Sequence, residues 1–183
     1  ANVIPEEPAP LWSVEKANEW AQGQPWYCGV NYIPAYAVNW TEMWDPSTFS
    51  AKNIDDEMDL MEECGFNCAR VVLQYAVYAE RPRTFKRNFR KFLEICDRHG
   101  VEVMPIFIEP VACGANTDPV TGPQGEPLEG WYGWAWSPSP GYSMMFDERT
   151  FPLIEKFVKD IMTTFKDDER IMAWDLYNEP IHY

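Results

Sequence analysis

The hydrophobic positions of the chain fall into four short, nearly continuous runs that alternate with segments of helical period. The runs are rich in β-branched and aromatic residues, which is typical of strands. Their continuity indicates parallel strands covered on both faces rather than a sheet with one face in water. The predicted strands are Trp26 to Asn31, Asn67 to Leu73, Glu102 to Ile108 and Ile171 to Tyr177.

Three amphipathic helices are predicted between the strands, because apolar residues recur there at spacings of three and four. We assign their apolar stripes to the core. The first stripe contains Ile54, Met58 and Met61, and we expect Asn53 to cap its start and Gly65 its end. The other two run from Phe85 to Cys96, between Thr84 and Gly100, and from Phe151 to Phe165, with Pro152 in the first turn.

The resulting order, β-α-β-α-β-α-β, predicts an α/β fold in which each helix returns the chain so that the next strand lies parallel to the last. It fits the first half of a (β/α)8 TIM barrel, strands 1 to 4, or the start of a doubly wound sheet. The turn after the first strand, Gly29 to Tyr32, lacks the glycine pattern that cradles a phosphate. This absence favours the barrel over a nucleotide-dependent enzyme.

The predicted domain organisation has two segments. Residues 1–25 are interpreted as an extended lead-in, and residues 26–183 as the N-terminal half of the barrel. The chain starts with Ala1, and the Pro-rich segment from Ile4 to Pro10 follows. We therefore expect an extracellular or periplasmic location. No apolar run approaches the roughly 20 residues that a membrane helix needs, so no membrane is expected as a partner.

Composition removes several classes of function. Fifteen basic residues against 29 acidic ones leave a net charge of −14, which would repel a nucleic acid backbone and an anionic membrane surface. The five cysteines and two histidines show no ligand spacing typical of zinc sites. We therefore expect no metal and no cofactor, and we expect most cysteines to be buried as small hydrophobic residues.

The most specific motif is the segment Ile171 to Pro180, which reads IMAWDLYNEP. Its end, Asn-Glu-Pro, resembles the end of the fourth barrel strand in clan A glycoside hydrolases, where this sequence carries the catalytic acid/base. Taken together, several further segments are similar to a bacterial cellulase-like and β-1,4-xylanase-like group related to glycoside hydrolase family 5. These segments are Cys28 to Pro34, Ala37 to Trp44, Cys64 to Val72 and His99 to Pro105.

This resemblance implies a retaining β-glycoside hydrolase that acts on a β-linked polysaccharide or oligosaccharide, with Glu179 as the general acid/base. Asn178 would hydrogen-bond the sugar 2-hydroxyl, a contact that strengthens in the transition state. Arg70, at the end of the second strand, would keep the partner carboxylate ionised through a charge-assisted bond. The resemblance also places Asn31, Trp40, Glu42 and Trp44 at the mouth of the barrel.

The long Pro- and Gly-rich segment after the third strand, Glu109 to Phe146, lies where barrel enzymes build their active sites. Four of the six residues 131–136 are aromatic, and flat aromatic rings can pack against the apolar faces of sugars. Trp131, Trp134 and Trp136 are therefore predicted to bind substrate, and the alternative is an aromatic cluster that anchors the loop. The family pattern has an acidic pair and Cys-Trp after the third strand, which this chain lacks, so the substrate preference stays open.

The retaining mechanism needs a second carboxylate, which the resemblance assigns to a seventh strand beyond this chain. Four parallel strands also leave two open sheet edges. We expect the remaining half of the barrel in the same gene product or in a second chain, or else two copies paired into a pseudo-barrel. Such a pair would place the two Glu179 carboxylates opposite each other, which does not suit an acid and a nucleophile. The isolated chain is therefore expected to be inactive. The alternative function is a noncatalytic carbohydrate-binding half-barrel.

Overall fold

The computed structural model describes residues 11–113, 115–125 and 135–180. Four parallel strands form one sheet in the order β1-β2-β3-β4, and helices alternate with them along the chain. The predicted α/β fold with sequential parallel strands is thereby confirmed. The strands are β1 (Gly29–Asn31), β2 (Cys68–Val72), β3 (Glu102–Ile108) and β4 (Asp175–Tyr177).

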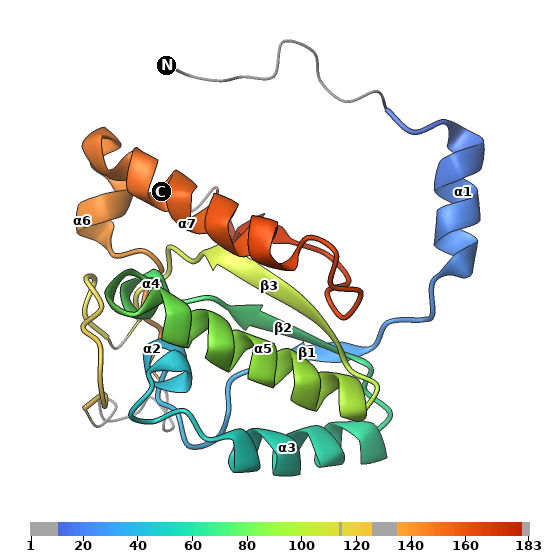
Figure 1. The fold of residues 1–183 in the computed structure, drawn as a ribbon, viewed down its shortest axis with the longest axis horizontal. Helices are drawn as coiled ribbons and strands as arrows, with labels where there is room; N and C mark the ends of the chain where they lie inside the picture. The colour runs from blue at the N-terminus through green and yellow to red at the C-terminus, as the bar shows by residue number, and fades with distance from the viewer. Residues whose placement is uncertain (1–10, 114, 126–134, 181–183) are drawn as a thin grey trace.

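The helices that follow the strands run alongside the sheet, whereas the first helix stands apart from it (Figure 1). That first helix contains no buried residue, and the segment that precedes the sheet therefore adds little to the core. The helices are α1 (Val14–Gly23), α2 (Trp40–Trp44), α3 (Ala51–Glu63), α4 (Tyr75–Glu80), α5 (Pro82–Arg98), α6 (Tyr142–Met145), the 3-10 helix η1 (Glu148–Thr150) and α7 (Phe151–Phe165).

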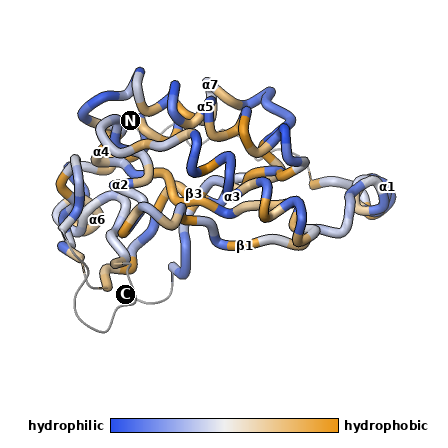
Figure 2. Tube along the Cα trace, turned by 90° about the horizontal axis from the view of Figure 1, so that it is seen from below, coloured by the Kyte–Doolittle hydropathy of each residue, from blue (hydrophilic) through white to orange (hydrophobic). Residues whose placement is uncertain are grey.

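Successive residues of the strands alternate between the helix-covered face of the sheet and the opposite face. Ala69 and Val71 on β2 are fully buried on the helix side, as are Val103 and Phe107 on β3. Arg70 lies between two of these residues and is only partly buried. In the helices, hydrophilic residues lie on the outer turns (Figure 2). The opposite face is the one that would line the inside of a closed barrel.

The core is centred on the aromatic side chain of Trp44, which ends helix α2. Its ring lies 5.7 Å from Phe85, 5.8 Å from Phe89 and 5.5 Å from Phe92, measured between ring centroids. Its indole N–H donates to the carbonyl oxygen of Val72 at 2.6 Å. Aromatic pairs in such tilted and edge-to-face geometry add to the free energy of burial, so α2, α5 and the end of β2 are tied together at this point.

The observed helix boundaries correct several predictions. Helix α3 begins at Ala51, and its cap is Ser50, whose hydroxyl accepts from the Asn53 N–H, so Asn53 is not the cap. Helix α5 begins at Pro82 rather than after Thr84, because proline suits the first turn, where its missing N–H costs nothing. Helix α1 forms inside the segment 1–25 that was expected to be extended.

Strand β4 is shorter than predicted because its pairing with β3 is interrupted by one extra residue. Val103 pairs with Ile171 and Ile106 with Asp175, so three steps along β3 match four steps along the last strand. Such a bulge exchanges the faces of the residues that follow it. Trp174 consequently stacks on Phe107 on the helix side, with ring centroids 5.4 Å apart, and Asp175 lies on the face that carries Arg70.

The cysteines differ from their predicted burial. All five are free thiols, but only Cys96 is buried, and Cys28 and Cys64 are exposed. The prediction that most of them are buried is wrong, because those beside strand starts and helix ends lie at the surface. Among the described residues, every helix is too short or too polar to cross a bilayer.

The first prediction concerns the contact between β1 and β2. A Cβ added to Gly29 would lie 1.9 Å from the carbonyl oxygen of Cys68 and 2.7 Å from its carbonyl carbon. Both atoms belong to the backbone, so they cannot move aside without separating the strands. Gly29→Ala should lower the free energy of unfolding by about 1–3 kcal/mol or more, as measured by urea denaturation. Gly23→Ala is the control, because a Cβ there meets no atom within 4 Å, and stability should not fall.

The second prediction concerns His99, which follows α5 and bonds to two carboxylates of α3. Its Nε2 lies 3.0 Å from Asp55 and its Nδ1 2.9 Å from Glu62. The bond to Asp55, supported by Glu62, raises the pKa of His99 above 6.5. The stabilisation is complete below about pH 6.5 and is lost as the pH rises through the pKa of the folded state.

Because both carboxylates are largely exposed, the effect should be no more than about 1 kcal/mol. Unfolding free energies measured on both sides of this pH range should therefore fall with rising pH in the wild type and change less in His99→Gln. An equal pH dependence in both proteins would show that this pairing contributes nothing to stability.

Candidate functional site

The guanidinium of Arg70, on β2, gathers polar side chains from β1 and from the end of β4. Its Nε donates to Asp175 at 3.0 Å, and its Nη2 also donates to that carboxylate. Its Nη1 donates to Asn31 at 3.1 Å, and its Nη2 to Asn178 at 2.9 Å. Both donors reach the same oxygen, Oδ2 of Asp175, and because the donors of arginine form a rigid fork, the two bonds fix the plane of the guanidinium. Arg70 therefore links the ends of β1 and β4 from its place on β2.

Glu109 directly follows β3 and is 1% exposed. Its carboxylate accepts from the backbone N–H of Val111 at 2.8 Å and from Nδ2 of Asn178 at 2.9 Å. Burial raises the pKa of Glu109, and the charge of Glu179 adds to the rise, whereas its two hydrogen bonds and the charge of Arg70 lower the pKa. The balance leaves a carboxyl group whose pKa is above its ordinary value at the carboxyl edge of the sheet.

Glu179 follows Asn178 at the end of the last strand and is exposed. Its φ angle is +45°, in the left-handed region, which costs a non-glycine residue about 1–3 kcal/mol. The preceding N–H of Asn178 is held by the Ile108 carbonyl at 2.8 Å, so the chain enters this turn from a fixed strand. Strain of this kind is typical of functional sites, where the surrounding structure imposes it.

A cavity of about 180 Å³ opens beside these residues, on the face of the sheet that carries Arg70. Trp40 and Trp136 form an edge-to-face pair in its wall, with ring centroids 5.2 Å apart. Asn31, Arg70 and Glu109 contribute polar groups to the cavity, and most of the other lining residues are apolar. Its lining is Asn31, Tyr32, Ile33, Val38, Trp40, Arg70, Val72, Ile106, Glu109, Ala135 and Trp136.

The loop after β3 brings Trp136 to this cavity. Backbone pairing joins Glu109 to Ser139 and Cys113 to Trp136, so the loop returns antiparallel to its own start. The buried amide of Gln74 donates to the hydroxyl of Thr41 at 3.1 Å and to the carbonyl of Pro138 at 3.1 Å. These bonds hold the loop against α2 and make Trp136 part of a fixed wall.

Several predicted site residues come together, and others do not. Asn31, Arg70 and Asn178 form one hydrogen-bonded cluster, and Trp136 lines the cavity beside it. Trp44 is completely buried in the core, so its predicted contact with substrate is wrong. The helix α2 turns this ring toward α5, while Trp40, one turn earlier, faces the cavity. Trp131 and Trp134 lie outside the described residues.

Glu42 also departs from its predicted role. Its carboxylate accepts from the backbone N–H of Val38 at 2.8 Å and from that of Gln124 at 3.4 Å. It thereby braces two loops against each other and does not line the cavity.

The sequence reasoning assigned no role to Asp175 and Glu109, which complete the site. An acidic residue directly after a predicted strand is the signal that could have identified Glu109. No comparable signal existed for Asp175, because only the bulge turns it toward Arg70.

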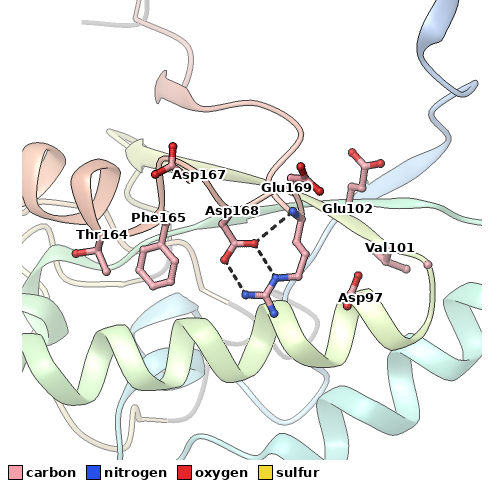
Figure 3. Close-up of a pocket in the computed structure, with 10 residues that line it drawn as sticks. Asp97, Val101, Glu102, Thr164, Phe165, Asp167, Asp168 and Glu169 are labelled. Atoms are coloured by element: carbon pink, nitrogen blue, oxygen red, sulfur yellow. Dashed lines mark hydrogen bonds and ion pairs between the residues drawn. The ribbon is translucent and has the colours of Figure 1, made fainter.

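A larger hollow, of about 820 Å³, lies at the opposite, amino-terminal ends of β3 and β4 (Figure 3). Asp97, Glu102 and Asp167 give it an acidic wall. Its one arginine, Arg170, is paired with Asp168 through two bonds of 2.7 Å. Because barrel enzymes bind substrates at the carboxyl ends of their strands, this hollow is not the candidate active site.

Potential metal ligands gather away from the cavity. Within the part of the chain that the structure describes, one group of acidic and histidine residues has ligand atoms within 4.8 Å of one another, namely Asp59, Glu62 and His99. Both ring nitrogens of His99 are already hydrogen-bonded to carboxylates. The group therefore has a structural role in joining α3 to the end of α5.

Comparisons with known proteins show the fold. No protein-family model and no curated protein matches the chain. Among solved structures, it is similar to the family 5 glycoside hydrolase GH5_18 from Streptomyces cattleya in complex with GlcNAc, with a TM-score of 0.54 and 16% identity. A structure of the same hydrolase, substituted at one residue and bound to Manβ1-4GlcNAc, has a TM-score of 0.52 and 15% identity.

The similarity covers 80% of this chain but only 32% of the hydrolase chains. The chain therefore spans about a third of the length of the structures that it matches. At such low identity the likeness concerns the backbone, and it agrees with the strand order described above. The chain has the α/β architecture of part of a family 5 (β/α)8 barrel.

Proposed function

We propose that this chain supplies the acid/base part of the active site of a retaining β-glycoside hydrolase, with Glu179 as the proton donor. The observation that carries the proposal is the cluster around Arg70, which joins Asn31 and Asn178 beside a cavity with two tryptophan rings. Asn178 and Glu179 are consecutive, so fixing the first places the second at the same edge. The fold shared with family 5 hydrolases supports the same assignment.

The proposed chemistry uses each of these groups. Glu179 protonates the glycosidic oxygen as the bond to the anomeric carbon breaks, and later removes a proton from the attacking water. Asn178 hydrogen-bonds the sugar 2-hydroxyl, and Trp136 packs against an apolar sugar face. The β linkage and the choice of a polysaccharide or oligosaccharide substrate belong to this proposal. No cofactor takes part in these steps.

The second carboxylate and the rest of the barrel wall would come from a further part of the same gene product or from a second chain. The surface beside β4 fits such a neighbour. An apolar groove of about 440 Å³ runs there between α7 and the edge strand, and Leu176 and Tyr177 are exposed in it. Exposed apolar groups next to an unpaired strand edge favour the addition of a further strand and helix.

The second candidate function is carbohydrate binding without catalysis. The cavity favours this second function, since the Trp40 and Trp136 pair and the polar cluster around Arg70 could hold a sugar without a second carboxylate. Measuring the hydrolysis of a glycoside substrate distinguishes the two functions. A noncatalytic half-barrel would retain oligosaccharide affinity in Glu179→Gln and show no hydrolysis in the wild type.

Replacement of Glu179 by glutamine tests the proton donor in the protein that carries the complete barrel. Hydrolysis of an aryl β-glycoside with a poor leaving group, such as phenol, should fall about 10²–10⁴-fold, because the leaving oxygen is no longer protonated. Formation of the glycosyl-enzyme from a dinitrophenyl glycoside should fall much less, since that leaving group needs no proton. Glu169→Gln, in the hollow at the other end of the strands, should leave both rates unchanged. Equal losses on the two substrates would contradict the assignment.

Replacement of Trp136 by alanine tests the sugar platform. We expect the affinity for β-1,4-linked oligosaccharides, measured by isothermal titration calorimetry, to fall about 10-fold or more as the apolar stacking surface is lost. Trp26→Ala is the matched control, because that ring is exposed and lies outside the cavity lining. Similar affinities in the two variants would exclude this wall of the cavity as a sugar site.

A further inference from the structure

Glu109 has no part in the proton transfers described above, yet it is the most deeply buried carboxylate of the site. Its backbone is fixed on both sides, because its N–H donates to the Ser139 carbonyl and its carbonyl accepts from the Ser139 N–H, each at 2.8 Å. It is one of the residues that line the cavity, and it is 1% exposed. Burying a carboxylate is costly unless hydrogen bonds compensate, so its partners show what it does.

Each carboxylate oxygen of Glu109 receives one N–H. Oε1 accepts from the backbone of Val111 at 2.8 Å, and Oε2 accepts from Nδ2 of Asn178 at 2.9 Å. An ionised carboxylate satisfies both donors, because it contains only acceptors. A glutamine could not, since in either orientation its NH2 group would face one of these two N–H donors. The site therefore requires an ionised carboxylate and not merely a polar side chain.

The amide of Asn178 is consequently held at both ends. Its Oδ1 accepts from Arg70 at 2.9 Å while its Nδ2 donates to Glu109. The reversed amide would place an oxygen against a carboxylate and an NH2 group against a guanidinium. The charges of Arg70 and Glu109 thus select one of the two amide orientations. In that orientation one Nδ2 hydrogen bonds to Glu109, and the second can serve a sugar hydroxyl.

We propose that Glu109 is a positioning residue for glycoside cleavage, which holds the Asn178 amide so that Nδ2 donates to the sugar 2-hydroxyl. This inference rests on the proposed function. Glu109 acts through Asn178 and contacts no reacting atom. Its effect should therefore depend on the 2-hydroxyl of the substrate and on the presence of Asn178.

The ionisation of Glu109 depends on the groups that face it. Burial raises its pKa and the charge of Glu179 adds to the rise, whereas the two N–H donors and the charge of Arg70 lower it. Burial also raises the pKa of the Tyr177 phenol, and the charge of Glu109 adds to that rise. Protonation of Glu109 would add a donor where two donors already point, so it would release the amide of Asn178.

A kinetic experiment on the protein that carries the complete barrel tests the dependence on substrate. Glu109→Gln should lower kcat about 10–100-fold on an aryl β-glycoside, with little change in KM, because a hydrogen bond involving charged groups is misdirected. The loss should nearly disappear on the matching 2-deoxy glycoside. It should also nearly disappear in an Asn178→Ala background. Equal losses on both substrates, or losses that multiply with Asn178→Ala, would overturn the proposal.

A second measurement requires no turnover. In the ¹⁵N-labelled chain, the side-chain amide resonance of Asn178 should shift with pH as Glu109 takes up a proton, and it should shift again in Glu109→Gln. The amide of Asn88, which donates to the Trp44 carbonyl at 3.3 Å, is the internal control and should stay in place. Because the pH titration uses the wild type, it remains informative even where the variant does not fold.

The two measurements distinguish the two proposals. If the Asn178 amide responds to Glu109 while the protein that carries the complete barrel shows no hydrolytic activity, the positioning contact is supported and the proposed function is overturned. If the Asn178 amide resonance changes neither with pH nor in Glu109→Gln, the positioning role is overturned whatever the activity of the protein.

Discussion

The arrangement of the candidate site depends on one constraint, which is that the guanidinium of Arg70 must direct its donors to acceptors on β1 and at the end of β4. Oδ2 of Asp175 accepts two of these bonds, and Asn31 and Asn178 accept one each. Without this positive charge, the carboxylates of Asp175 and Glu109 would share a partly buried edge with no counter-charge, which is unfavourable in a low-dielectric environment. Arg70 therefore allows several acidic groups to gather where the parallel strands end.

A second constraint comes from the face and the edge of the sheet that no helix covers. Helices cover one face, and their aromatic core around Trp44 is dense enough to fix the four strands. The other face and the edge beside β4 expose polar and apolar groups together, including Leu176 and Tyr177. The same open face provides the cavity in which Trp40 and Trp136 meet Arg70. The proposed substrate access and the proposed covering element would thus both depend on one structural feature.

Much of this could be predicted from the pattern of residues. The strand order, the three main helices and the place of Arg70 and Asn178 at strand ends follow from hydrophobic periodicity and motif position. The cavity wall was only partly predictable. Trp44 and Trp40 stand four residues apart on a short helix, and nothing local distinguishes the core-facing ring from the cavity-facing one. Glu42 likewise has the composition of a site residue but braces two loops.

The sequence by itself determined the succession of elements, because helical and strand periods are local properties that each segment carries alone. It also suggested the proposed chemistry, since Asn178, Glu179 and Arg70 belong to motifs that can be recognised without coordinates. Only the tertiary structure decided which side chains meet. The single extra residue before β4 turns Asp175 toward Arg70 and Trp174 toward the helices, and the return of the long loop buries Glu109 against Asn178. Register and loop path depend on contacts between distant segments, and such contacts leave no periodic signal along the chain.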